Sequence, residues 1–190
     1  MRAVLVAVCL LVFTQVAAAQ DPKGSTSVPP RATGTSSAPT GQLRMSGNVY
    51  IGELAPDFEL TNARGRPIKL SRLRGHSLLL AFAERREDLR QFREILPLVS
   101  DLDVTIVCVC ADKPQTLKTY VERDSIPYEM LSDATREVAA IYGLLDRERT
   151  WILPGFLLLD ANGVVKMALI GRLPPTEQIA ELTRFVTTGL

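Results

Sequence analysis

Two apolar runs, Leu78-Leu-Leu-Ala-Phe-Ala83 and Val104-Thr-Ile-Val-Cys-Val-Cys110, lie at the centre of the sequence. Continuous apolar runs of this length are typical of strands that are covered on both faces. Between the runs, apolar residues recur at helical spacing, at Leu89, Phe92, Leu96 and Val99. This spacing predicts a helix over residues 85–102, with a kink at Pro97 because proline has no backbone N–H to donate to the preceding turn.

Shorter elements surround this centre. They are hairpins over 57–70 and 156–170, a short strand at 128–131, and helices over 113–123, over 133–143 and from Thr176 onward. Asp112 is the expected N-cap of the helix that begins at Lys113, and Gly143 suits the end of the next one. This order predicts an α/β fold with a mixed central sheet, helices on both faces and an N-terminal β-hairpin.

Residues 49–190 have the size and composition of one domain. The chain is 46% hydrophobic and 23% charged, which excludes wholesale disorder. Residues 49–190 hold 18 lysines and arginines against 20 aspartates and glutamates, a net charge of about −2. A domain that is weakly acidic is not expected to bind nucleic acid.

Residues 1–19 predict a secretory signal peptide. Arg2 supplies a positive start, residues 3–13 are apolar, and Ala17-Ala18-Ala19 fits a signal-peptidase site. The eleven apolar residues span about 16 Å as a helix, against ~30 Å of hydrocarbon. We therefore expect an exported protein, periplasmic or extracellular, with no membrane span after cleavage.

Residues 20–48 predict a disordered linker. Serine, threonine, proline and glycine account for 17 of these 29 residues, so the segment has almost nothing to bury. The domain organisation that we expect is a signal peptide at 1–19, a linker at 20–48 and one domain at 49–190.

Several segments of this domain match one known family in order and spacing. They are Ile51-Gly-Glu-Leu-Ala-Pro-Asp-Phe-Glu-Leu60, Gly65 to Gly75, Phe92-Arg-Glu-Ile-Leu-Pro97, Cys110-Ala-Asp112, Leu131-Ser-Asp133 to Gly143, and Pro154-Gly-Phe-Leu-Leu-Leu-Asp160 with Asn162-Gly163. Together they resemble the redoxins, which include the alkyl hydroperoxide reductase/thiol-specific antioxidant (AhpC/TSA) proteins, the peroxiredoxins and the exported thiol–disulfide oxidoreductases. The resemblance implies a thioredoxin-like fold and a redox or antioxidant activity.

The chemistry of that family needs a cysteine at the start of the helix that follows the strand matching 78–83. The helix dipole and nearby cations lower the pKa of such a thiol, so that it is a nucleophilic thiolate at neutral pH. Here residues 84–91 read Glu-Arg-Arg-Glu-Asp-Leu-Arg-Gln and contain no cysteine. A Cys-x-x-Cys pair falls on Leu89 and Phe92 in one register and on Glu87 and Arg90 in the other. The Pro-x-x-x-Thr-x-x-Cys loop of the peroxiredoxins is missing as well.

Cys108 and Cys110 are the remaining candidates for redox catalysis. They lie two residues apart on a strand, so both side chains point to the same face, with Cα atoms about 6.6 Å apart. Cys110 is the stronger candidate because it lies nearer the carboxyl end of its strand, where α/β sites open. The alternative is that both are small apolar residues of the core, as cysteines in buried strands commonly are.

Pro154, Arg85 and Arg86 are the candidate binding residues. Pro154 matches the family's cis-proline, which faces the redox centre and binds the backbone of a partner, although a trans loop proline is the alternative. Arg85 and Arg86 lie at the start of the helix that lacks its cysteine, where an anion could bind. A solvated face with alternating charges is the other explanation of these arginines. The single histidine, His76, has no assigned role, and we expect no metal or other cofactor.

Three functions remain open. The favoured hypothesis is a redoxin domain that is degenerate at the catalytic position and binds a protein or peptide. The second is a non-standard thiol–disulfide oxidoreductase or antioxidant enzyme that uses Cys110 with Cys108. The third is a module that binds a small molecule or anion at the arginine-rich helix start.

Overall fold

A computed structural model of the chain describes residues 49–148 and 150–188. The predicted signal peptide (1–19) and linker (20–48) lie outside the described residues. Within the described part, no helix has the length and apolarity that crossing a membrane requires.

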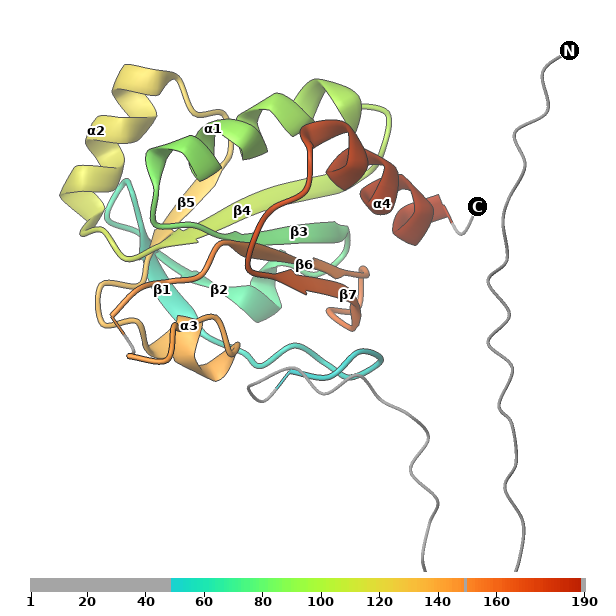
Figure 1. Cartoon of the computed structure of the whole chain (residues 1–190), viewed down its shortest axis with the longest axis horizontal. Coiled ribbons are helices and arrows are strands. Elements are labelled where there is room, and N and C mark those ends of the chain that lie inside the picture. Colours follow the sequence, from blue (N-terminus) through green and yellow to red (C-terminus); the bar gives the residue numbers. More distant parts are fainter. Residues whose placement is uncertain (1–48, 149, 189–190) are drawn as a thin grey trace, which may run out of the picture. The chain divides into compact units, whose positions relative to one another are not determined.

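A seven-stranded mixed sheet forms the centre of the domain (Figure 1). The strands run in the order β2-β1-β5-β4-β3-β6-β7. β3, β4 and β5 are parallel, and the other neighbours are antiparallel. Both predicted hairpins are present, as β1–β2 and β6–β7. The bounds are β1 Glu59–Asn62, β2 Pro67–Lys69, β3 Ser77–Phe82, β4 Val104–Cys110, β5 Glu129–Ser132, β6 Gly155–Leu159 and β7 Val165–Ile170.

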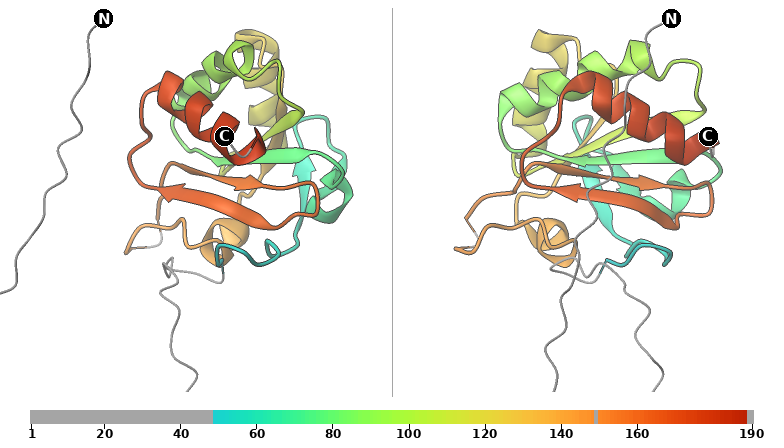
Figure 2. Two further views of the ribbon diagram at one scale, coloured as in Figure 1. Left: turned by 90° about the vertical axis from the view of Figure 1, so that its right-hand side faces the viewer. Right: turned by 45° about the vertical axis from the view of Figure 1, so that its right-hand side comes forward.

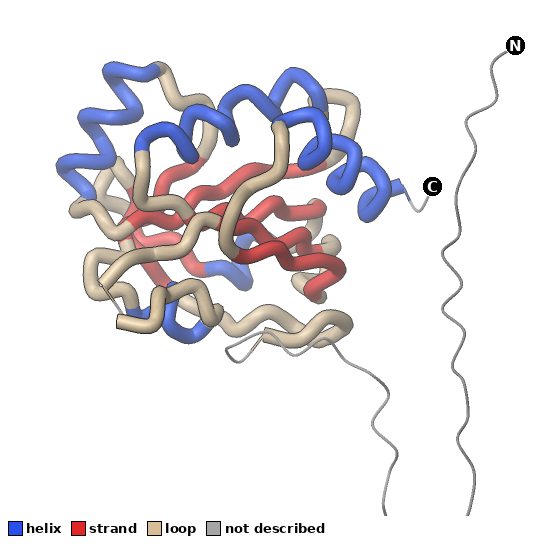
Figure 3. The backbone as a smooth tube through the Cα atoms, in the orientation of Figure 1, coloured by secondary structure: helices blue, strands red, loops and turns tan. Residues whose placement is uncertain are grey.

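Helices cover both faces of this sheet, as predicted, but unequally (Figures 1 and 2). Three helices lie on one face: α1 (Arg86–Ile95), α2 (Pro114–Asp124) and α4 (Thr176–Thr188). The other face carries the short helix α3 (Glu137–Ile141) and the irregular segment that precedes β1. Figure 3 shows how much of that second covering layer is loop. Each face has its own apolar core, and the alternation of side chains along β3 and β4 divides the strand residues between the two.

The helix after β3 ends differently from the prediction. Instead of a kink within one helix, α1 stops at Ile95 and a 3₁₀-helix follows over Leu96–Leu98. Pro97 has no N–H for the carbonyl one α-turn earlier, so the chain tightens into 3₁₀ geometry there. The segment ends in a turn in which the Ser100 hydroxyl donates to the Pro97 carbonyl over 3.0 Å.

Two helix starts also differ from the prediction. Lys113, not Asp112, is the N-cap residue of α2, since Pro114 occupies the first helical position. α3 begins at Glu137, four residues after Asp133, because Arg136 has a left-handed backbone with φ of 58°. Asp133 still caps the helix, since its carboxylate accepts the backbone N–H groups of Val138 (3.3 Å) and Ala139 (2.8 Å).

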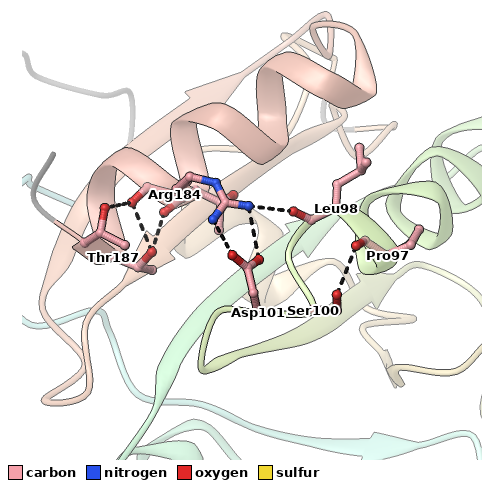
Figure 4. Close-up of polar contacts among 8 residues, drawn as sticks. Pro97, Leu98, Ser100, Asp101, Arg184 and Thr187 are labelled. Carbon is pink, nitrogen blue, oxygen red and sulfur yellow. Dashed lines mark hydrogen bonds and ion pairs between the residues drawn. The ribbon is translucent and has the colours of Figure 1, made fainter.

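Arg184 fastens α4 to the turn before β4 (Figure 4). Its guanidinium pairs with both carboxylate oxygens of Asp101 and donates to the carbonyl of Leu98 over 3.1 Å. The hydrogen bond from Arg184 lowers the pKa of Asp101 below its usual value. Because the pair is exposed, it orients the helix and stabilises the fold only weakly.

The register of the sheet brings several loops to one edge. The carboxyl ends of the parallel strands β3, β4 and β5 lie together, so the chain leaves this edge at Glu84, Asp112 and Asp133. β6 runs antiparallel to β3 and pairs Gly155 with Phe82. Pro154 therefore enters the same edge, opposite the segment where β3 ends. We call this group of loops, which lies at the carboxyl end of the inner strand β3 and not at a lateral edge of the sheet, the β3 edge.

Candidate functional site

Glu84 is the central charged residue of the β3 edge. One carboxylate oxygen accepts a hydrogen bond from Arg136 Nη2 at 2.7 Å, and the other accepts the backbone N–H of Ile152 at 2.6 Å. Only 13% of the Glu84 side chain is exposed. A single carboxylate thus joins the end of β3 to the start of α3 and to the loop that leads into β6.

Arg136 is held in a strained position by this contact. Its backbone lies in the left-handed region that favours glycine, and its side chain is 31% exposed. Its Nε is buried and has no hydrogen-bond partner among the described residues. A backbone conformation of this kind persists only where surrounding contacts enforce it, and the pairing with Glu84 is one such contact.

Asp112 lies at the same edge, at the end of β4. Its carbonyl accepts the Ser132 hydroxyl at 2.7 Å, which ties the end of β4 to that of β5. Burial raises the pKa of the Asp112 carboxyl, the charge of Glu84 raises it further, and Arg136 opposes both. Glu84, Asp112 and Arg136 therefore form one electrostatic group, which the sequence did not indicate.

Cys108 and Cys110 point to the same face of β4, as predicted, and lie in the core beneath α1. Their exposed fractions are 0% and 1%, and their sulfurs are 3.8 Å apart, with no disulfide between them. The contact with Cys108 and the burial of the site raise the pKa of Cys110 well above its usual value, and the charges of Asp112 and Glu84 act in the same direction. The Cys110 sulfur is therefore a protonated thiol at neutral pH, the less nucleophilic form.

Tyr128 links α1 to the sheet above the two cysteines. Its hydroxyl donates to the carbonyl of Leu89 in α1 at 2.6 Å, and only 7% of the residue is exposed. Burial raises the pKa of Tyr128, and the nearby thiols add to the effect. The hydrogen bond fixes the first half of α1 on the sheet, so that solvent reaches the thiols only if this helix moves.

Of the predicted binding residues, Pro154 is the one that the fold places opposite the end of β3. It is half-buried, and its carbonyl accepts the N–H of Gly171 at 2.8 Å. The cis geometry of its peptide bond stays a prediction. Arg85 is the N-cap residue of α1; its side chain is 66% exposed and pairs with Asp88 at 3.3 Å. Arg86 begins α1, and its side chain lies outside the described part.

His76 lies at the opposite end of β3, before Ser77, where its Nδ1 is 2.9 Å from Asp103. It is thus remote from the β3 edge along its strand. Within residues 49–148 and 150–188, no group of three or more histidine, cysteine, aspartate or glutamate side chains is arranged to hold a metal ion.

The exposed loop beside the site carries the chain's single tryptophan. Trp151 is 58% exposed, on a loop closed by the Leu145–Ile152 bridge. The Asp146 carboxylate accepts the backbone N–H groups of Thr150 (2.7 Å) and Trp151 (3.0 Å). The exposed Trp151 thus precedes Ile152, whose N–H is held by Glu84.

The domain has a parallel β3–β4–β5 core with a helix after its first strand, a closing β6–β7 hairpin, and a proline opposite the end of β3. These features define a thioredoxin-like domain of the redoxin class. The family model described as "AhpC/TSA family" matches residues 51–168. The chain belongs to the AhpC/TSA family, as the resemblance of its motifs predicted.

Curated relatives from two branches of this redox family are similar to the chain. A chloroplastic peroxiredoxin Q of Sedum lineare is 25% identical over 158 residues, which cover 79% of this chain and 84% of the relative. The thiol–disulfide oxidoreductase ResA of Geobacillus thermodenitrificans is 28% identical over 131 residues, 65% of this chain and 71% of the relative.

Solved structures confirm the fold. Peroxidoxin BcpB from Mycobacterium tuberculosis superimposes with a TM-score of 0.64 at 19% identity, covering 75% of this chain and 98% of that one. A thiol peroxidase from Chromobacterium violaceum gives a TM-score of 0.64 at 19% identity, covering 76% and 91%.

Proposed function

We propose that this protein is an exported redoxin-family domain that has lost thiol catalysis and acts by binding a protein or peptide at the β3 edge. The observation that carries the proposal is the position of Glu84. Residue 84 ends the strand that the family's reactive cysteine follows, and this chain has there a carboxylate with both oxygens already engaged, by Arg136 and by the Ile152 N–H, while no cysteine follows it in residues 85–92.

The chemistry of a carboxylate supports the loss of catalysis. Thiol–disulfide exchange and peroxide reduction pass through a sulfur that is oxidised and then reduced again. Residues 84–92 contain no sulfur atom. Cys110, the nearest candidate along the strand edge, is buried and has a raised pKa, so neither access nor charge favours attack on a substrate.

The preserved shape of the edge supports a binding role. Pro154 lies opposite the end of β3, and the exposed Trp151 precedes Ile152, whose N–H is held by the same Glu84 carboxylate that pairs with Arg136. Exposed aromatic residues on rigid supports are the usual anchors of protein interfaces. The predicted leader at 1–19 supports export.

Binding at this edge has an internal reporter, because Trp151 is the chain's single tryptophan. A suitable probe is reduced, carboxymethylated ribonuclease A, an unfolded polypeptide without tryptophan. We expect its addition to shift and quench the Trp151 emission saturably, and Pro154→Ala to weaken the effect, whereas Pro175→Ala, at an exposed proline before α4, leaves it unchanged. An emission spectrum that does not respond at any probe concentration contradicts binding at this edge.

The second candidate is an enzyme that uses the two buried thiols, and the 3.8 Å between their sulfurs is the observation in its favour. A coupled assay with hydrogen peroxide, and one with a disulfide substrate, separate the two candidates. We expect no turnover above the uncatalysed rate, and titration with a thiol reagent that detects the thiols of the domain only after denaturation. Turnover that disappears in Cys110→Ser establishes the enzyme instead.

A further inference from the structure

Two hollows lie side by side, one between α1 and the α2–β5 connection and the other beside α2 and β5. One, of about 390 Å³, is lined by Glu87, Leu89, Arg90, Arg93, Asp124 and Ile126. The other, of about 410 Å³, lies between α2 and the β1–β5 side of the sheet. Ile126 lines both, so the hollows are separated by the width of one residue.

The ridge between the hollows, residues 125–127, is held from both sides. Ser125 ends α2 with a left-handed backbone (φ 47°), and the N–H of Ile126 donates to the Val121 carbonyl at 3.2 Å. Arg93 of α1 donates to the carbonyl of Asp124 at 2.7 Å. The hollows are therefore built between fixed elements and are ready for a ligand without rearrangement.

Both hollows have an apolar floor. In the first, Leu89 and Ile126 are 3% and 9% exposed. In the second, the floor consists of Ile126, Tyr128 at 7% and Met130 at 1%. The side chains at the bottom of each hollow are thus mainly apolar.

The rims are charged, and most of these charges are already paired. Arg90 pairs with Glu94 at 3.5 Å, Lys118 pairs with Glu122 at 3.8 Å, and Glu129 accepts a hydrogen bond from Asn62 at 2.8 Å. In the described part of the chain, two rim side chains make no hydrogen bond or ion pair. They are Glu87 on the first hollow and Arg64 on the second.

We propose that the ridge 125–127 and its two hollows bind an extended peptide that carries two apolar side chains, a basic residue at the Glu87 end and an acidic residue at the Arg64 end. In an extended strand, alternate side chains point the same way and lie about 6.6 Å apart, which suits two hollows divided by one residue. The unpaired carboxylate of Glu87 attracts the basic end of the peptide, and the unpaired guanidinium of Arg64 attracts its acidic end. The site shares no lining residue with the β3 edge and does not depend on the function proposed for it.

A designed peptide, acetyl-Lys-Leu-Ser-Leu-Glu-amide, serves as the probe for the full-length chain labelled with ¹⁵N. We expect saturable amide shifts in residues 87–93 and 118–130. We expect Glu87→Lys to weaken binding about three- to tenfold, since the reversal replaces one exposed attraction by a repulsion. The peptide with glutamate in place of its lysine restores the affinity for Glu87→Lys.

The matched control is Glu177→Lys, a charge reversal at the same first-turn position of another helix, α4. We expect it to leave the affinity unchanged. An equal loss in Glu177→Lys, or failure of the charge-swapped peptide to restore binding to Glu87→Lys, refutes the pairing with Glu87. Shifts that are confined to residues around 84 and 151–155 place the peptide on the β3 edge and overturn the proposal, as does a spectrum without shifts.

Discussion

Replacing Glu84 by alanine tests whether its carboxylate organises the β3 edge. The substitution removes the acceptor of two hydrogen bonds at once, one from the Arg136 guanidinium at 2.7 Å and one from the Ile152 N–H at 2.6 Å. Ile152 is 3% exposed, so its N–H is left without water as a substitute partner. Arg136, which already has one buried nitrogen unpaired, loses its counter-charge.

The expected loss of stability comes from these two contacts. A lost hydrogen bond between charged groups costs roughly 1.5–3 kcal/mol, and a buried, unsatisfied N–H roughly 1–3 kcal/mol. Because Arg136 is 31% exposed and can turn partly to water, we take the lower half of the combined range, about 2.5–4 kcal/mol. For a domain of this size that corresponds to a fall in Tm of about 8–14 °C.

Urea unfolding followed by circular dichroism measures this loss, as a lower midpoint at an unchanged slope. Glu87→Ala is the matched control, since Glu87 lies three residues along and has no side-chain partner in the described structure; we expect a change within about 0.5 kcal/mol. A double-mutant cycle with Arg136→Ala should give a coupling energy of about 1–3 kcal/mol. If Glu84→Ala is no more destabilising than Glu87→Ala, the carboxylate does not hold the edge together.

Three further outcomes can be measured on the same material. Tyr128→Phe leaves the Leu89 carbonyl without its donor, so we expect a loss of about 1–2 kcal/mol in urea unfolding and faster reaction of the buried thiols with a thiol reagent. Asp133→Ala removes the cap of α3, and we expect a loss of about 1–2 kcal/mol, with faster amide exchange at Val138 and Ala139; unchanged exchange rates contradict the cap. Asp112 has a folded-state pKa above its ordinary value of 3.8, so its charged form disfavours folding and this cost grows as the pH rises through the folded pKa. We therefore expect Asp112→Asn to stabilise the protein at pH 7 and this advantage to vanish in acid; an advantage that does not change with pH contradicts it.

The sequence predicted the sheet well because the signals for it are local and strong. The apolar runs at 78–83 and 104–110 are typical of buried strands, and both hairpins had clear turns. Helix limits were less predictable, since they depend on single backbone states. Nothing in the sequence around residue 136 indicates that an arginine adopts the left-handed conformation that shortens α3. The tertiary pairing with Glu84 is one of the contacts that hold it there.

The sequence predicted where the candidate site lies, but not which residues make its central contacts. Matching the motifs pointed to the end of β3 and to Pro154, and residues 84–92, which follow, contain no cysteine. It did not single out Glu84, because one glutamate in a run of alternating charges looks like any solvated residue. Its partners, Arg136 and Ile152, are 52 and 68 residues away in the sequence, so only the fold reveals the contact.

Glu84 shows how the β3 edge can be held together without the family's cysteine. It does not take the place of that cysteine, since neither register of the Cys-x-x-Cys motif falls on residue 84. It lies at the end of the strand that the cysteine follows in the family, and its carboxylate pairs with the Arg136 guanidinium and accepts the Ile152 N–H. A carboxylate, unlike a thiolate, cannot form a disulfide. The contacts that hold these loops in place therefore need no sulfur, which is the premise of the binding role that we propose for this edge.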